Sequence, residues 1–216
     1  MQECMAKKPE GEYFHAMTTA IPPSVPQEKR LTKGERTRLQ LLEVAAAEFA
    51  ERGFQHTRIS DIVARAGVTQ PVFYQYFASK QAAYDELVGM FAQRLRQEVC
   101  QARLSDDQDL PVEVRVRRGV SNWLAILQED PNLTRIGFFQ VDAAEALKDE
   151  LVEMISENVR IDQRAGVFRK DIPPEWLSHA FMGVIERFTR REPNAEEREA
   201  LADFITDMFL EGVRQR

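Results

Sequence analysis

Several features that would place this 216-residue sequence in a particular class of protein are missing from it. Two cysteines, Cys4 and Cys100, are too few for a disulfide framework. The three histidines, His15, His56 and His179, have no cysteine, histidine or carboxylate at the spacing of metal ligands, so we expect no metal site and no cofactor. No apolar run approaches the ~18 residues of a membrane-spanning helix.

A secretion signal is missing too, because the first 30 residues contain no apolar segment of the kind that such a signal needs. The same segment shows no apolar periodicity and contains Pro9, Pro22, Pro23 and Pro26. This composition favours a flexible N-terminal extension over residues 1–30. We therefore expect a cytoplasmic protein.

Positive charge is scarce overall, since the formal net charge is −6. Residues 29–80, however, hold nine Lys or Arg and five Asp or Glu, a local charge of +4. Residues 1–28 contribute −2, so residues 81–216 carry −8. Attraction to phosphates needs only a local patch, so the acidic total does not exclude a nucleic-acid binder. Charge alone leaves chance clustering as the other explanation.

The hydrophobic residues are spaced for helices, without a period-2 strand pattern or an internal repeat. We therefore predict an all-α fold of about nine helices, with a three-helix N-terminal domain followed by a larger helical domain. In the first helix Leu42, Ala45, Ala46 and Phe49 lie on one face, and Gly53 ends it.

A helix-turn-helix follows the first helix. A short second helix ends at Gly67, and a third runs over about Gln70–Tyr76. In such a motif the second helix of the pair enters the DNA major groove. Phe73 and Phe77 lie one turn apart and face the core. The side chains left to face outwards are Gln70, Pro71, Tyr74, Gln75 and Tyr76.

The chemistry of this outward face suits DNA. Tyrosine hydroxyls can contact phosphates, and Gln70 or Gln75 can bind the adenine edge, a contact that discriminates by roughly 1–3 kcal/mol. Lys80 follows Ser79, a predicted N-cap, where the helix dipole disfavours a cation by roughly 0.3–1 kcal/mol. A phosphate there would make the lysine favourable, and the same argument applies to Arg58. The alternative for both is an ordinary solvated side chain.

Residues from about 35 to 93 resemble the N-terminal domain of TetR-family repressors. The spacing from Gly53 through Gly67 to a Tyr-x-x-Phe-x-x-Lys run is specific to that resemblance, whereas the rest of the chain matches in helix pattern only. The matching residues are Ala45, Ala46, Phe49–Phe54, Thr57, Asp61–Val63, Ala66–Thr69, Phe73–Phe77, Ser79 and Lys80.

The resemblance implies a DNA-binding domain over residues 33–95, with its helix-turn-helix at about 58–77, and an effector-binding and dimerisation domain over 96–216. Arg58 stands where the family commonly has a second Ser or Thr, so either Thr57 caps the second helix or the capping bond is weaker here. The positions that often meet DNA in the family are Ser60, Thr69, Gln70, Pro71, Tyr74, Tyr76 and Lys80. With Thr57, Arg58 and Gln75, they form our candidate DNA-binding set.

The last two predicted helices, Pro174–Arg190 and Ala195–Val213, are amphipathic and rich in phenylalanine. By resemblance they form a homodimer interface, and the alternative is that their faces only close the monomer's own core. Large apolar side chains in the middle helices suit a hydrophobic or aromatic small-molecule effector, with ordinary core packing as the alternative for each. The candidate pocket residues are Trp123, Phe138, Phe139, Met154, Phe181 and Met182.

Together these features predict a sequence-specific DNA-binding transcriptional regulator, namely a dimeric repressor that a small molecule releases from its operator. A second hypothesis keeps the DNA binding without a small-molecule inducer, as a regulator or an architectural protein. A helical enzyme is disfavoured, because the sequence has no evident nucleophile–base pair, glycine-rich phosphate loop or metal cluster. We therefore expect neither enzymatic activity nor a membrane partner.

Overall fold

The computed structural model describes residues 32–102, 110–140 and 142–213. The extension predicted over residues 1–30 lies outside the described residues. Within the described ranges the fold is all-α, as predicted, with nine α-helices, one π-helical turn (η3) and no β-strand. The elements are α1 (Lys33–Arg52), α2 (Ile59–Ala66), α3 (Gln70–Tyr76), α4 (Lys80–Gln101), α5 (Val112–Glu129), α6 (Pro131–Thr134), η3 (Arg135–Phe139), α7 (Asp142–Arg164), α8 (Pro174–Thr189) and α9 (Ala195–Val213).

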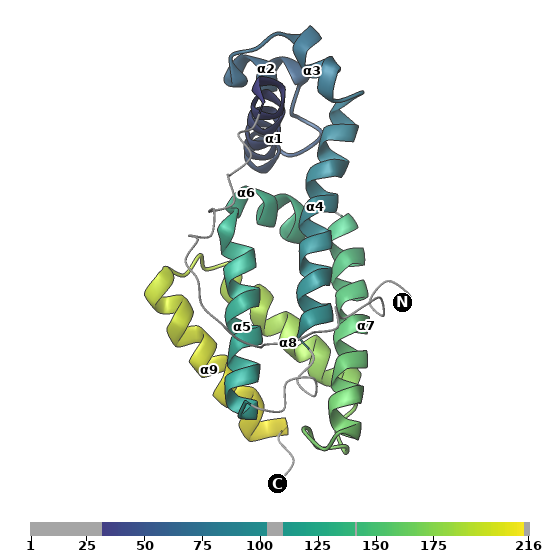
Figure 1. The fold of residues 1–216 in the computed structure, drawn as a ribbon, viewed down its shortest axis with the longest axis vertical. Helices are drawn as coiled ribbons and strands as arrows, with labels where there is room; N and C mark the ends of the chain where they lie inside the picture. Colours follow the sequence, from purple (N-terminus) through teal and green to yellow (C-terminus); the bar gives the residue numbers. More distant parts are fainter. Residues whose placement is uncertain (1–31, 103–109, 141, 214–216) are drawn as a thin grey trace, which may run out of the picture.

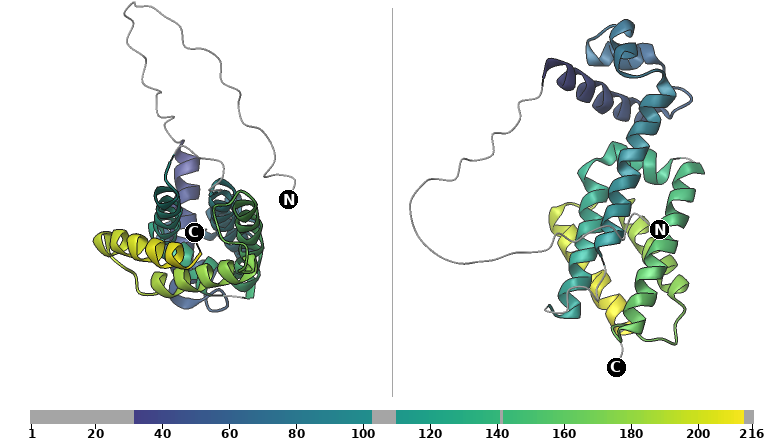
Figure 2. Two further views of the ribbon diagram at one scale, coloured as in Figure 1. Left: turned by 90° about the horizontal axis from the view of Figure 1, so that it is seen from below. Right: turned by 45° about the vertical axis from the view of Figure 1, so that its right-hand side comes forward.

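The helices form a head and a bundle that share one long helix. Helices α1, α2 and α3 make the head at one end of the molecule, and α4 runs from the head into the bundle (Figures 1 and 2). In the bundle α5 packs against α9, and α7 packs against α8. No helix in the described ranges is long and apolar enough to cross a membrane.

The predicted helix ends agree with the structure. Gly53 and Gly67 follow α1 and α2 with φ angles of 78° and 67°, which favour glycine over residues that carry a Cβ. The Ser79 hydroxyl accepts a hydrogen bond from a first-turn amide of α4 at 3.0 Å. Before α9, Asn194 and Glu197 each accept the other's backbone N–H at 2.9 Å, which forms a capping box.

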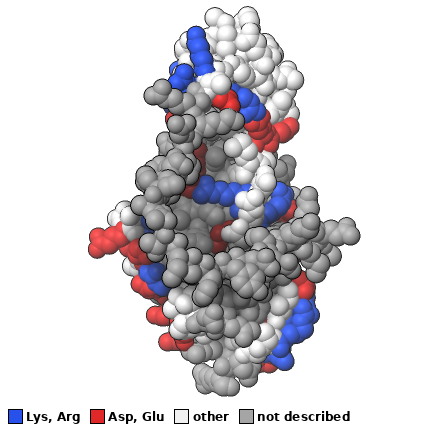
Figure 3. All heavy atoms as spheres, in the orientation of Figure 1, with Lys and Arg blue, Asp and Glu red and all other residues white. Residues whose placement is uncertain are grey.

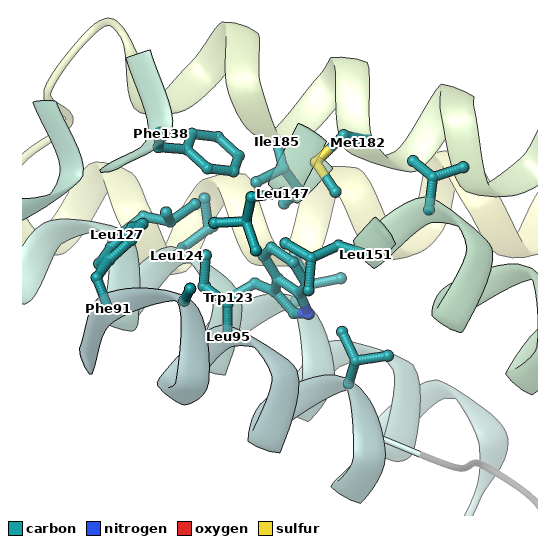
Figure 4. Packing of buried hydrophobic residues seen from close by; sticks show 14 of the residues in the cluster. Phe91, Leu95, Trp123, Leu124, Leu127, Phe138, Leu147, Leu151, Met182 and Ile185 are labelled. Atoms are coloured by element: carbon teal, nitrogen blue, oxygen red, sulfur yellow. The ribbon is translucent and has the colours of Figure 1, made fainter. Parts of the chain in front are cut away.

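Two hydrophobic cores divide within α4, between Leu87 and Phe91. The head core is centred on the fully buried Phe49, Ile62 and Phe73. Figure 4 shows the bundle core, to which α4, α5, α7 and α8 contribute. Its labelled members are Phe91, Leu95, Trp123, Leu124, Leu127, Phe138, Leu147, Leu151, Met182 and Ile185.

The segment α6–η3 fastens the head to the bundle. Ile136 of η3 is 1% exposed and belongs to the head core. The Gln140 side-chain amide donates a hydrogen bond to the carbonyl of Ala50 in α1 at 3.2 Å. Next to Ile136, the backbone of Gly137 passes so close to Phe91 that an added Cβ would lie 2.6 Å from the ring atom Cδ1. Only glycine fits this approach without a shift of the ring.

Candidate nucleic-acid interface

The turn between α2 and α3 sets the orientation of α3. Gly67 adopts the left-handed conformation, and the Val68 amide donates back to the Val63 carbonyl at 3.0 Å, which ends α2 and redirects the chain. Helix α3 is then held by Phe73 and Phe77, which are 0% and 3% exposed. The prediction that these two rings face the core is confirmed, and they fix which side of α3 remains free.

The free side of α3 is polar and uncharged. Tyr74 is 54% exposed, and its ring packs edge-on against Phe73 with 5.8 Å between centroids, which restricts its orientation. Figure 3 shows a largely uncharged tip of the head with Lys and Arg side chains beside it. The exposed members of the candidate set on and before α3 are Thr69, Gln70, Pro71, Tyr74 and Gln75, and those on and before α2 are Arg58 and Ser60.

Tyr76 differs from its prediction. The structure half-buries it against the head core instead of turning it outwards. The reason is helical spacing, because Tyr76 lies three residues after Phe73 and shares its face. Its hydroxyl points to the start of α1, where a Cβ added to Gly34 would lie 3.5 Å from it. Tyr76 therefore joins α3 to α1 and leaves the outward set.

Thr57 is also a correction. It is 1% exposed, and its hydroxyl lies 3.0 Å from the Glu48 carbonyl and 2.9 Å from the Gly53 carbonyl, both acceptors. It closes the loop after α1, so it neither caps α2 nor faces DNA. The N-cap of α2 is Arg58, whose backbone N–H donates to the Asp61 carboxylate at 3.3 Å without a bond from its own side chain to the helix.

Lys80 has partners other than the phosphate that we predicted. Its Nζ donates to the carbonyls of Phe54 at 2.6 Å and Thr57 at 2.9 Å. It also lies 4.3 Å from the centroid of the Phe54 ring, within cation–π range. In the structure the Lys80 ammonium is thus bound by these two loop carbonyls, where we had predicted a phosphate. Lys80 thereby joins α4 to the α1–α2 loop.

Ion pairing decides which cations of the head are available to an anion. The carboxylate of Glu48, 3% exposed, pairs with Arg52 at 3.1 Å and with Arg65 at 3.0 Å. Hydrogen bonds to Glu48 and then to Glu51 raise the pKa of Arg65 further above its ordinary value. A third arginine, Arg38, pairs with a carboxylate of α4 at 2.6 Å.

Three exposed cations of the head have no ion-pair partner among the described residues: Lys33, Arg36 and Arg58. Lys33 and Arg36 lie in the first turn of α1 near Gly34, the residue beside the Tyr76 hydroxyl at the end of α3. Our sequence-based set omitted both, although the charge excess of residues 29–80 included them.

A cavity of about 130 Å³ lies in the bundle, at the end of α4 that is remote from the head. Of the six candidate pocket residues, Trp123 and Phe181 line it, with their rings edge-on at 5.8 Å. Most of the lining is apolar, and its polar members are Arg115, Asn158 and Asp162.

The other four candidate pocket residues lie in the hydrophobic core or against it, away from this cavity. Phe138 and Met182 are 0% and 5% exposed and sit among core side chains (Figure 4). Phe139 packs beneath the Arg190 guanidinium, 4.2 Å from its ring centroid, and Met154 packs against the same core. None of these four residues lines the cavity.

Comparison with known proteins places these features in a family. Residues 41–87 match the family described as "Bacterial regulatory proteins, tetR family". The chain is 38% identical over 159 residues to an uncharacterised HTH-type transcriptional regulator, YdgC, of Bacillus subtilis (strain 168), which covers 73% of this chain and 82% of that protein. It is 27% identical over 184 residues to the HTH-type transcriptional repressor DhaR of Mycobacterium sp. (strain GP1), covering 80% and 90%.

Solved structures show the same fold. A crystal structure of a gamma-butyrolactone receptor (ArpA-like protein) superposes with a TM-score of 0.66 over 85% of this chain and 90% of that one, at 20% identity. At 20% sequence identity, this structural similarity supports a shared fold and nothing further. The regulator from Bacillus subtilis, by contrast, matches in sequence through most of both chains.

Proposed function

This chain is a member of the TetR family of transcriptional regulators, and from that premise we propose that it is a dimeric repressor. Its two α3 helices read an operator, and a small molecule bound in the bundle relieves its binding to DNA. The observation that carries the proposal is the free side of α3. It is held outwards by two buried phenylalanines, and the same head carries three exposed cations without an ion-pair partner among the described residues.

Each part of the head has a role in the proposed DNA contact. Gln70 and Gln75 offer amide groups that match the N6 and N7 edge of adenine, and Tyr74 can contact a phosphate or a thymine methyl. Thr69, Pro71 and Ser60 complete the contact surface of the helix-turn-helix. Lys33, Arg36 and Arg58 are placed to bind phosphates, which adds affinity without sequence preference.

Helices α8 and α9 carry the proposed dimer contact. Their inner faces bury Ile185 and Ile205 completely, yet their outer faces expose Trp176 by 71%, Phe204 by 53% and Met208 by 40%. Large exposed apolar side chains mark an interaction surface, and a self-complementary pair of helices suits a two-fold dimer. Two linked heads could then reach successive major grooves about one DNA turn apart.

The dimer contact is tested by the mass of the protein in solution. Phe204→Asp should yield a monomer in light scattering, because a charge replaces an exposed apolar contact. Met90→Asp is the matched control, since Met90 is an equally exposed apolar residue of α4, at 52%. A parent protein that is monomeric, or a Phe204→Asp variant that remains dimeric, would overturn this part of the proposal.

DNA reading is tested by selecting bound fragments from a genomic library and measuring affinity for the selected operator. Tyr74→Ala and Gln75→Ala should each weaken that affinity by about 5- to 150-fold, the equivalent of roughly 1–3 kcal/mol. Gln93→Ala, an exposed glutamine of α4, should bind like the parent. Unchanged melting curves would show that all three variants fold. If both α3 variants bind as tightly as the parent, α3 does not read the operator.

A further inference from the structure

The cavity in the bundle contains a cation whose buried nitrogens have no partner. Arg115, near the start of α5, lines the cavity and is 8% exposed. Its atoms Nε and Nη1 are buried without a hydrogen-bond partner, and no described carboxylate lies within ion-pair distance of its guanidinium. An unpaired buried charge is strongly destabilising, so a guanidinium buried to this extent is expected to have an anion beside it.

The two other polar residues of the lining do not meet this need. Asn158 donates its side-chain amide to the Val99 carbonyl at 2.6 Å. Asp162, 2% exposed, has an interaction partner of its own and forms no ion pair with Arg115. Arg115 is therefore the one cation among the described lining residues, and a planar guanidinium matches a carboxylate in two parallel hydrogen bonds.

The rest of the cavity determines the body of the ligand. Trp123, Phe168, Phe181 and Phe209 contribute aromatic rings to a predominantly apolar lining. A volume of about 130 Å³ is close to that of an engineered apolar cavity of ~150 Å³ that holds one benzene molecule. The space thus fits a single ring or a short branched chain.

From these observations we infer that the effector is a compact organic carboxylate, with an aromatic or short apolar body among the rings and its carboxylate on Arg115. This inference rests on the proposed function, since it names the chemical class of the small molecule that would act on the repressor. A neutral ligand of the same shape would leave the guanidinium unpaired and would bind more weakly.

The test uses the full chain and a pair of probes with the same number of non-hydrogen atoms, phenylacetate and phenylacetamide. Binding is followed by the fluorescence of Trp123 and by thermal shift. A Trp176→Phe background removes the exposed tryptophan, the other one in the sequence. We expect the acid to bind about tenfold more tightly than the amide, because its charge strengthens both hydrogen bonds.

Substitutions at Arg115 separate a binding role from a structural one. Arg115→Met should abolish the preference for the acid while leaving the unliganded protein as stable as the parent or more stable, because an apolar chain replaces an unpaired buried charge. Arg115→Lys should retain part of the preference through its charge. Arg135→Met, at an exposed arginine in η3, is the control and should retain all of it.

The outcomes that overturn the inference are distinct from those that overturn the proposed function. Equal binding of the two probes, binding of neither at millimolar concentration, or a preference for the acid that survives in both Arg115 variants would each refute the inferred ligand class. Operator binding by the unliganded protein is measured separately and would be untouched by any of these results. Its absence would refute the repressor proposal instead.

Discussion

Replacing Lys80 by methionine tests whether this lysine holds the head together or binds DNA. In the structure its ammonium donates to the carbonyls of Phe54 and Thr57 and lies over the Phe54 ring. Methionine preserves much of the apolar stem but removes all three interactions. The two carbonyls would then lack a donor in a loop that is partly closed to water.

The expected size of the effect follows from these contacts. A hydrogen bond from a charged group contributes about 1.5–3 kcal/mol, and a cation–π contact of partial exposure about 0.5–2 kcal/mol. Allowing for water that replaces part of the loss at this half-buried site, we expect Lys80→Met to reduce the free energy of unfolding by about 2–4 kcal/mol. For a protein of this size that corresponds to a fall in Tm of roughly 4–16 °C.

Thermal melting at fixed protein concentration, combined with operator binding over a range of salt, provides the assay. The loosened head should bind the operator more weakly, but the slope of log affinity against log salt should not change. Lys170→Met, at an exposed lysine of the bundle, controls for the loss of one charge and should leave Tm unchanged. A normal Tm with a salt slope smaller by about one unit would instead show a phosphate contact and refute our interpretation of Lys80.

Three further substitutions probe other contacts. Gly137→Ala brings a Cβ to 2.6 Å from Phe91, so it should cost about 1–3 kcal/mol in a denaturant titration, and less than additively when combined with Phe91→Leu. Thr57→Val should cost about 1 kcal/mol of stability without changing the affinity of the folded protein for DNA. A hydrogen bond from Arg96 lowers the pKa of Glu150, so this pair stabilises the fold above pH 4.5, the ordinary value, and the contribution disappears as the pH falls through the lowered pKa. Because both side chains are about two-fifths exposed, Arg96→Met should reduce the acid-dependent loss of stability by at most about 1 kcal/mol.

The helices and their ends could be predicted because the signals for them are local. Helical periodicity needs neighbours within two turns, and the caps at Ser79 and Asn194 involve residues three positions apart. The same local rule would have placed Tyr76 correctly, had its spacing from Phe73 been weighed against its polarity. The fold class and the free side of α3 were thus within reach of the sequence.

The role of Lys80 was out of reach because its partners are distant in the chain, whereas Thr57 bonds carbonyls only four and nine positions before it. The carbonyls that bind Lys80 lie 23 and 26 positions before it, and nothing in the sequence marks their convergence. The cavity was still less accessible, since its position depends on which space the packed helices leave unfilled. Phe138 and Phe181 are alike as residue types, yet one fills the core and the other lines the cavity.

Helix α4 provides a physical route between the two proposed sites. Its first residue, Lys80, is bound to the α1–α2 loop, and near its other end Val99 lines the cavity. Between them Phe91 meets the backbone of Gly137 with no room for even one more carbon. Because α4 is held this closely near its middle, it cannot slide freely along its axis. A displacement of its Val99 end would then turn α4 about the Phe91–Gly137 contact and move the head at the opposite end. With a helix of 22 residues and so about 33 Å in length, a tilt of a few degrees would move α3 by an ångström or more. Such a movement is enough to disturb two reading helices that must match successive major grooves.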